Sequence, residues 1–175
     1  MDKRIRSWQI AGFIFIGIAG TLLHFLYEWT KESILIAPFS AVNESIFEHI
    51  KLLYFPWLVF SLIEGRYLAD KNENFWCAKL KGIIVGIILI PTIFYTYTGA
   101  LGVMADWFNI AIFFIVSAVL LYTEAVILNS RKCLLPSAIS LFIIILIGII
   151  LVVLTFFPFH IPLFKDPVTN LYGIA

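Results

Sequence analysis

The chain has 175 residues, of which 62% are hydrophobic and only 13% are charged, and its formal net charge is +1. Soluble domains carry about 25% charged residues, so this composition predicts a membrane protein and excludes an ordinary soluble domain. With almost no net charge and no basic patch beyond the flanks of the apolar runs, no nucleic-acid partner is expected.

Five apolar runs are long enough to cross a bilayer, which takes about 20 residues for roughly 30 Å of hydrocarbon. They cover residues 8–27, 47–63, 80–98, 107–128 and 135–157. These runs predict an all-α, polytopic bundle of five transmembrane helices, with residues 1–175 forming one membrane domain. A shorter apolar stretch at 34–42 predicts a re-entrant or interfacial segment. Prolines keep the tail at 158–175 from continuing as a helix.

The basic residues predict the orientation in a cell membrane, because positively charged flanks stay in the cytoplasm. Three lie on the side opposite the N-terminus, namely Lys31, Lys51 and Lys165, and nine lie on its own side, namely Lys3, Arg4, Arg6, Arg66, Lys71, Lys79, Lys81, Arg131 and Lys132. The N-terminus is therefore expected in the cytoplasm and the C-terminus outside. The first run resembles a signal peptide but is expected to stay as a helix.

Three further features concern the organisation of the bundle. Cys77 and Cys133 fall on the predicted cytoplasmic side, where thiols stay reduced, so no disulfide is expected. The polar stretch 64–74 is expected to be a loop. Gly82 and Gly86 allow a close approach of another helix, either within the chain or in a homo-oligomer.

All three histidines, His24, His49 and His160, fall at the predicted outer ends of runs one, two and five. Charged or titratable groups inside a membrane helix are costly and commonly functional. His24 and Glu28 are four residues apart, so they share a helix face and could present two ligands together. The alternative is that Glu28 belongs to the interfacial rim and that His24 bonds a neighbouring helix.

The segment NESIFEHIK, residues 43–51, is the most charged part of the predicted outer side. Asn43 is expected to cap the second helix, with Glu44 in its first turn. Capping does not account for Glu48 and His49, and we expect these two residues to be functional. The alternative is a structural pair between Glu48 and a snorkelling Lys51.

The tail contains His160 and Asp166 in an apolar, proline-rich context. We expect it to fold back over the outer helix ends like a lid, and the alternative is a disordered tail. In the fourth run, Asp106, Asn109, Ser117 and Glu124 share one stripe. They could line a path across the membrane, but the ends are better explained as interface residues, with Asn109 and Ser117 bonding neighbouring helices.

Four strings together resemble a group of small bacterial membrane proteins known only as a domain of unknown function. They are GTLLHFLYEW at 20–29, NESIFEHIKLLYFP at 43–56, FYTYTGALG at 94–102, and FPFHIPLFKDP with the closing LYG at 157–173. The resemblance covers nearly the whole chain and implies bacterial origin and a shared polytopic fold. It implies no reaction and no catalytic residue.

The leading hypothesis from the residues is an enzyme with its site at the outer membrane interface. His24, His49 and His160 are expected as ligands of a zinc-like divalent metal, Glu48 as a ligand or base, and Glu44 or Asp166 as a proton carrier. A metal-free variant uses His and Glu directly as acid and base. The reaction would be a hydrolysis or transfer on a lipid head group or lipid-linked substrate.

Two other hypotheses remain open from the sequence. A binding or transport subunit would use the same polar cluster to capture a cation or a small polar solute. A structural partner protein would use it as a buried hydrogen-bond network.

Overall fold

The structure, a computed structural model, describes residues 2–130 and 133–174. Five long helices follow one another along the chain: α1 (Lys3–Trp29), α2 (Ile46–Leu68), α3 (Phe75–Leu101), α4 (Asp106–Ser130) and α5 (Ser137–Phe156). Two short 3-10 turns, η1 (Ala69–Lys71) and η2 (Pro162–Phe164), accompany them. The described residues contain no β-strand, only an isolated bridge between Lys165 and Tyr172. The predicted all-α fold is confirmed.

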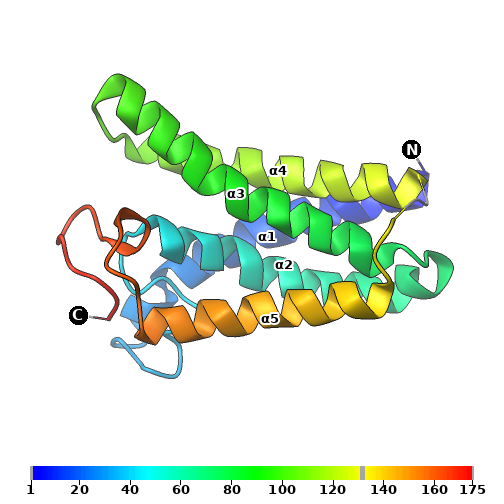
Figure 1. The fold of residues 1–175 in the computed structure, drawn as a ribbon, viewed down its shortest axis with the longest axis horizontal. Coiled ribbons are helices and arrows are strands. Elements are labelled where there is room, and N and C mark those ends of the chain that lie inside the picture. Colours follow the sequence, from blue (N-terminus) through cyan, green and yellow to red (C-terminus); the bar gives the residue numbers. More distant parts are fainter. Residues whose placement is uncertain (1, 131–132, 175) are drawn as a thin grey trace.

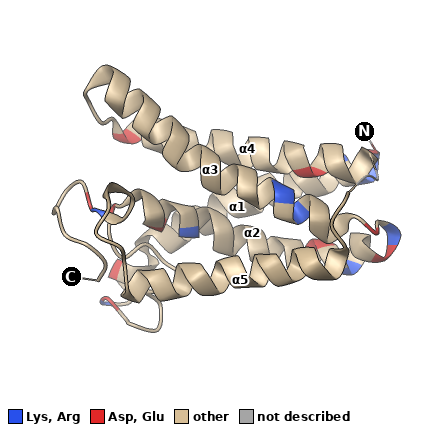
Figure 2. Cartoon of the chain, in the orientation of Figure 1, with Lys and Arg blue, Asp and Glu red and all other residues tan. Residues whose placement is uncertain are grey.

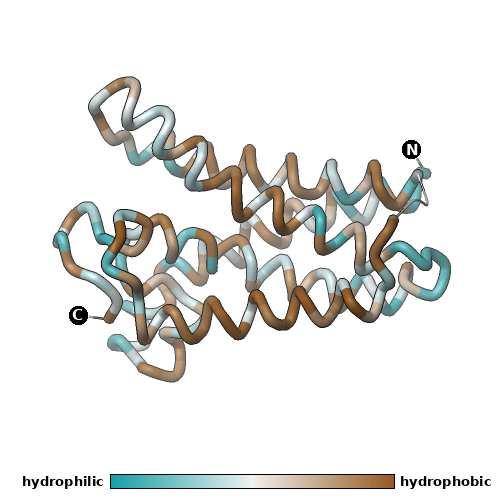
Figure 3. The backbone as a smooth tube through the Cα atoms, viewed as in Figure 1, coloured by the Kyte–Doolittle hydropathy of each residue, from teal (hydrophilic) through white to brown (hydrophobic). Residues whose placement is uncertain are grey.

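All five long helices are long and apolar enough to cross a membrane. Hydrophobic residues run along their length, while hydrophilic residues gather in the connections at the two ends of the bundle (Figure 3). Charged residues also lie in these connections, and others lie within the long helices (Figure 2). Four of the helices extend beyond the predicted apolar runs, since for example α1 begins at Lys3 and α2 continues to Leu68, whereas α5 lies within the run at 135–157.

The helices lie side by side with α2 as the central one (Figure 1). In the most apolar part of α2, 67% of the residues are buried inside the protein, against 22% for α1 and 28% for α5. Helix α4 packs against α3 and α1, and α5 packs against α3 and α2. A chain that crosses a membrane would therefore expose α1 and α5 to lipid and shield α2.

The connections divide between the two ends of the bundle (Figure 1). One end holds the N-terminus, the turn between α2 and α3, and the connection from α4 to α5. The other end holds residues 30–45, the turn between α3 and α4, and the C-terminal tail. We call these the N-terminal end and the tail end.

Residues 34–42 stay at the tail end as a series of turns and do not cross the bundle, as an interfacial segment would. Buried Ser40 ties the segment to the end of α1. Its hydroxyl donates to the Leu23 carbonyl and accepts a hydrogen bond from the Tyr27 amide at 3.0 Å. These bonds supply partners to backbone groups near the end of the helix.

The structure corrects three sequence expectations about organisation. Cys77 and Cys133 form a disulfide, with their Cα atoms 6.3 Å apart, because the connection before α5 passes the first turn of α3. The stretch 64–74 is not all loop, since α2 continues through Glu64 and η1 follows it. The tail is not wholly non-helical, because it includes η2. Arg131 and Lys132, part of the basic cluster, lie outside the described residues.

Gly82 and Gly86 are used for packing within the chain. A Cβ atom at Gly82 would lie 2.5 Å from Cγ of Glu124, and one at Gly86 would lie 2.9 Å from Cδ2 of Leu53. Both glycines are buried in α3. The two glycines therefore allow α3 to pack closely against α2 and α4. This is the close approach within the chain that the sequence predicts as one of two alternatives.

Candidate metal or acid-base site

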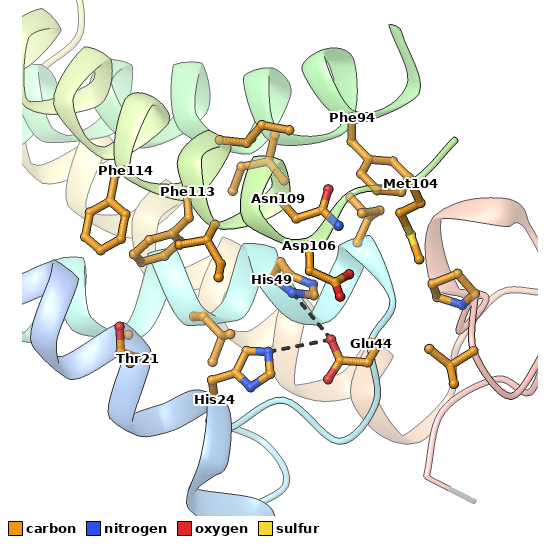
Figure 4. Close-up of a pocket in the computed structure, with 18 of the residues that line it drawn as sticks. Thr21, His24, Glu44, His49, Phe94, Met104, Asp106, Asn109, Phe113 and Phe114 are labelled. Carbon is orange, nitrogen blue, oxygen red and sulfur yellow. Dashed lines mark ion pairs between the residues drawn. The ribbon is translucent and has the colours of Figure 1, made fainter. Parts of the chain in front are cut away.

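At the tail end, one carboxylate lies between two imidazoles. Oε2 of Glu44 is 3.6 Å from Nε2 of His24 and 3.8 Å from Nε2 of His49 (Figure 4). The two imidazole rings meet edge to face with centroids 5.6 Å apart. Among the described residues these three form a group whose ligand atoms lie within 4.8 Å of one another. They come from α1, from the segment before α2, and from α2.

The spacing of these atoms fits a metal ion. In a tetrahedral zinc site with bonds of about 2.1 Å, neighbouring ligand atoms lie roughly 3.4 Å apart. The observed separations of 3.6 and 3.8 Å from Glu44 lie close to that value, and all three ligand atoms lie within 4.8 Å of one another. Two histidines and a glutamate also form a known catalytic zinc set, which leaves a fourth position for water.

The backbone determines which nitrogen of His49 is available. Nδ1 of His49 lies 2.9 Å from the Ser45 carbonyl oxygen, which can only accept a hydrogen bond. Nδ1 must therefore carry a proton, so that Nε2 of the neutral ring bears a lone pair. That lone pair faces a carboxylate oxygen. Two acceptors at this distance repel each other unless a proton or a metal cation lies between them.

Glu44 is positioned by a turn before α2. The Oδ1 atom of Asn43 accepts from the Ser45 amide at 2.9 Å, and its Nδ2 donates to the Gly173 carbonyl at 2.9 Å. The expectation that Asn43 caps the helix is corrected, because Ser45 occupies the N-cap and Glu44 precedes the first turn. This turn holds Glu44 outside the helix, where it reaches His24 as well as His49.

The surroundings of Glu44 keep its carboxylate charged. The nearby His24 imidazole is the largest cause and lowers the pKa of Glu44 below its usual value. Partial burial acts against this shift, and the charges of His24 and His49 reinforce it. A carboxylate that stays ionised at neutral pH is the form that binds a metal.

The site opens into a cavity of about 440 Å³ bounded by α1, α2, α3, α4 and the tail. Its wall is mainly apolar, with Phe94, Met104, Phe113 and Phe114 among its side chains (Figure 4). Asp106 and Asn109 of α4 add polar groups near the imidazoles (Figure 4). The cavity thus has an apolar body and a polar part formed by the histidines and carboxylates.

Glu48 does not join this group. Its Oε2 lies 2.7 Å from Nζ of Lys51 and accepts from the Val42 amide at 3.0 Å. Lys51 also donates to the Ala37 carbonyl and to Oγ1 of Thr155, at 2.8 and 2.9 Å. The structural pair of Glu48 and Lys51, the alternative considered from the sequence, is therefore present. However, Lys51 does not snorkel, because it is fully buried.

The tail covers the site without adding its expected ligands. Pro167 and Val168 line the cavity, as a lid would. The His160 ring instead packs against Tyr172, with centroids 4.8 Å apart. The Asp166 carboxylate accepts from the Val168 amide and the Thr169 hydroxyl, at 2.7 and 2.8 Å. His160 thus lies outside the three-residue group, and Asp166 stabilises a turn.

The expected pairing of His24 with Glu28 is replaced by the contact of His24 with Glu44, and Glu28 is exposed. In the α4 stripe, Oδ1 of Asn109 accepts from the Tyr97 hydroxyl at 2.5 Å, which agrees with its expected role between helices. The Ser117 hydroxyl instead bonds the Phe113 carbonyl of its own helix. Glu124 is fully buried, so its interpretation as an interface residue is wrong.

Comparison with known proteins identifies a family but no individual relative. The sequence profile described as "Family of unknown function (DUF6512)" matches residues 1–174. The chain belongs to this family. The expected membership in a family of unknown function is confirmed, and DUF6512 carries no established activity. No curated protein and no solved structure matches the chain.

Proposed function

We propose that this DUF6512 protein is a membrane-embedded hydrolase or transferase whose site consists of His24, Glu44 and His49. The observation that carries the proposal is the pair of acceptor atoms, Nε2 of His49 and Oε2 of Glu44, held 3.8 Å apart. A divalent, zinc-like metal between them and Nε2 of His24 would satisfy all three atoms. It would then lower the pKa of a bound water and polarise a carbonyl or phosphoryl group.

The base that accepts a proton from the water is assigned to Asp106. This carboxylate lines the same cavity from α4, while Glu48 is held by Lys51. Without a metal, the same residues would act as an acid-base set, with His49 or His24 passing a proton to Glu44. In both versions Glu44 replaces Glu48 as the central carboxylate.

The substrate class is proposed from the walls of the cavity. The cavity volume of about 440 Å³ lies in the range of small-molecule sites. Phe25 of α1 is 43% exposed, and Ile110 and Phe114 of α4 are 60% and 37% exposed, although all three line the cavity. In a bilayer these side chains would face lipid. A lipid or lipid-linked substrate could therefore enter between α1 and α4, with its polar group at the imidazoles.

The same observations weigh against the two alternatives. A purely structural network would be sealed, as the pair of Glu48 and Lys51 is, but the side chains of His24 and Glu44 are 29% and 48% exposed. A transport path would need polar groups through the middle of the bundle. There the central cluster includes Leu53, Trp57, Ile83 and Leu120, which are fully buried.

The proposal places the protein in a cell membrane with the site on the extracytoplasmic side, following the charge asymmetry. It is tested by reconstituting the protein in vesicles made from lipids of the source membrane. Lipid turnover is measured by mass spectrometry with zinc and with a chelator. We expect a product that forms only with zinc. The His49→Ala variant should not form this product, and the His160→Ala variant should form it. Absence of any product, or equal turnover by His49→Ala, would contradict the proposal.

A further inference from the structure

A second cluster of charged side chains lies toward the N-terminal end, remote from the proposed site. Nζ of Lys79 on α3 is 2.5 Å from Oε2 of Glu64 on α2 and 2.5 Å from Oε2 of Glu124 on α4. All three side chains are 0% exposed. Two carboxylates therefore share one ammonium group inside the bundle, and their formal charges do not balance.

The elements around this cluster supply polar groups but no further charge. Gln9 of α1 donates from Nε2 to Oε1 of Glu64 at 3.3 Å, and Trp57 of α2 donates from Nε1 to Oε1 of Glu124 at 2.6 Å. Helix α5 contains no charged residue. Within the described part of the chain, no other cation forms an ion pair with either carboxylate. The fully ionised cluster would thus carry one uncompensated negative charge.

An uncompensated charge without access to water is strongly unfavourable. The same chain contains a balanced counterpart. Glu48 and Lys51 are equally buried, at 1% and 0% exposure, and form a pair of one carboxylate with one ammonium. The triad of Glu64, Lys79 and Glu124 reaches the same balance if it takes up one proton.

An unpartnered buried acceptor lies beside the cluster. Gln9 is only 8% exposed, and its Oε1 atom has no hydrogen-bond partner, although the same amide contacts Glu64. The two ends of a glutamine amide exchange places when the group turns over. A protonated Glu64 would then donate its O–H to Oε1 of Gln9. The hydroxyl of Ser61, one turn before Glu64, is also buried and unpartnered.

We propose that Glu64 and Glu124 form a proton-binding site, in which the pair holds one proton beside Lys79. The step is simple uptake of a proton from water, in which one carboxylate becomes a carboxyl group and one O–H bond forms. The bound proton makes the triad neutral overall. It also lets Glu64 donate to Oε1 of Gln9 once the amide has turned over, in place of the bond that Nε2 of Gln9 now donates to Glu64. This site is independent of the proposed metal or acid-base site at the tail end.

The test is infrared spectroscopy of the full-length, detergent-purified protein at neutral pH, where a protonated carboxyl group gives a C=O band separate from carboxylate bands. We expect this band in the unaltered protein. We expect its loss in both Glu64→Gln and Glu124→Gln, because each leaves one carboxylate balanced by Lys79. Glu48→Gln is the matched control, since it removes a buried carboxylate that is already balanced, and it should keep the band.

Absence of the band from the unaltered protein would overturn the proposal, and so would its persistence in Glu64→Gln or in Glu124→Gln. If a variant does not fold, isotope-labelled glutamate in the unaltered protein provides the same answer. The label must shift the band, because the proposed carrier is a glutamate. A band that does not move would assign the proton to another residue type and would also overturn the proposal.

Discussion

His49 shows how a single backbone contact defines the chemistry of a side chain. The Ser45 carbonyl holds the proton of the imidazole on Nδ1 and leaves Nε2 for a ligand, as backbone carbonyls do around many metal-bound histidines. This carbonyl belongs to the N-cap residue, one turn before His49, and it also accepts hydrogen bonds from the backbone amides of Glu48 and His49 at 3.1 and 3.4 Å. Neither the proton on Nδ1 of His49 nor the position of the Ser45 carbonyl depends on the side chain of Ser45.

Replacing glutamate by glutamine should therefore have different effects at Glu44 and at Glu48. Glu44→Gln should abolish zinc binding with little change in stability, because Glu44 is half-exposed. Glu48→Gln should lower the free energy of unfolding by about 3–5 kcal/mol, because it leaves the buried Lys51 unpaired. Titration calorimetry with zinc and thermal unfolding in detergent measure the two effects. If the two variants lost zinc binding and stability to the same extent, the assignment of Glu44 to the site and of Glu48 to a structural pair would be contradicted.

Zinc binding should weaken on acidification because protons compete with the metal for the imidazoles. The pKa of Glu44 is lowered, chiefly by its contact with His24, so its carboxylate stays charged in mildly acidic solution and the loss of affinity there comes from the imidazoles. Affinity should thus fall as the pH drops from neutral to mildly acidic, with the carboxylate adding a loss only under more acidic conditions. A zinc affinity that is constant from neutral to mildly acidic pH would argue against imidazole ligands.

At the scale of single residues, the sequence predicts part of the site. His24, His49 and Glu44 were all candidates, because charge at a helix end in an apolar chain is costly. Glu48 was preferred over Glu44 because it lies inside the helix. Its partner Lys51 was visible at i+3, but burial of both groups could not be inferred from spacing. The position of His160 depended on the path of an irregular tail.

At the scale of the helices, α2 makes polar side-chain contacts to all four other long helices. Its residues Trp57, Ser61 and Glu64 follow one another at i, i+4 and i+7, which places them on one face. This spacing was a signal for the buried cluster. The spacing alone does not reveal the cluster, because the sequence predicts a loop at Glu64, a basic flank at Lys79 and an interface position at Glu124. Charges near helix ends are ambiguous until the partner helices are known.

The close packing of α3 on α4 gives a prediction with an internal control. Gly82→Ala should destabilise the protein by about 1–3 kcal/mol, because the new methyl group would meet Glu124 at 2.5 Å. Gly99→Ala lies in the same helix with nothing within 4 Å, so it should be neutral or slightly stabilising. Thermal unfolding of both variants in one detergent measures the difference. Equal stability of the two variants would contradict this helix packing.

For the whole molecule, the number and type of helices were predictable because each crossing needs a long apolar run. The disulfide was not, since it depends on how the connection before α5 passes over α3. Disulfides persist in oxidising compartments, whereas the basic flanks assign this end to the cytoplasm. The two observations lead to opposite orientations, and an experiment can separate them.

With the N-terminus in the cytoplasm, Cys77 and Cys133 should be reduced in growing cells and form their disulfide only after isolation. Because Cys77 is fully buried, the cells are quenched and denatured in acid before an alkylating reagent is added, and both thiols should then react. Mass spectrometry of the modified protein gives the result. Protection of both cysteines in cells would reverse the orientation and move the proposed site to the cytoplasmic side.

The central claim is that His24, Glu44 and His49 bind a metal together. The most direct measurement is the zinc affinity and stoichiometry of the detergent-purified protein, compared with those of His24→Ala, His49→Ala and His160→Ala. We predict one zinc per chain, a loss of affinity greater than about 100-fold in the first two variants, and no change in the third. Melting temperatures should stay close to that of the unaltered protein. No zinc binding, or binding that survives both His24→Ala and His49→Ala, would contradict the claim.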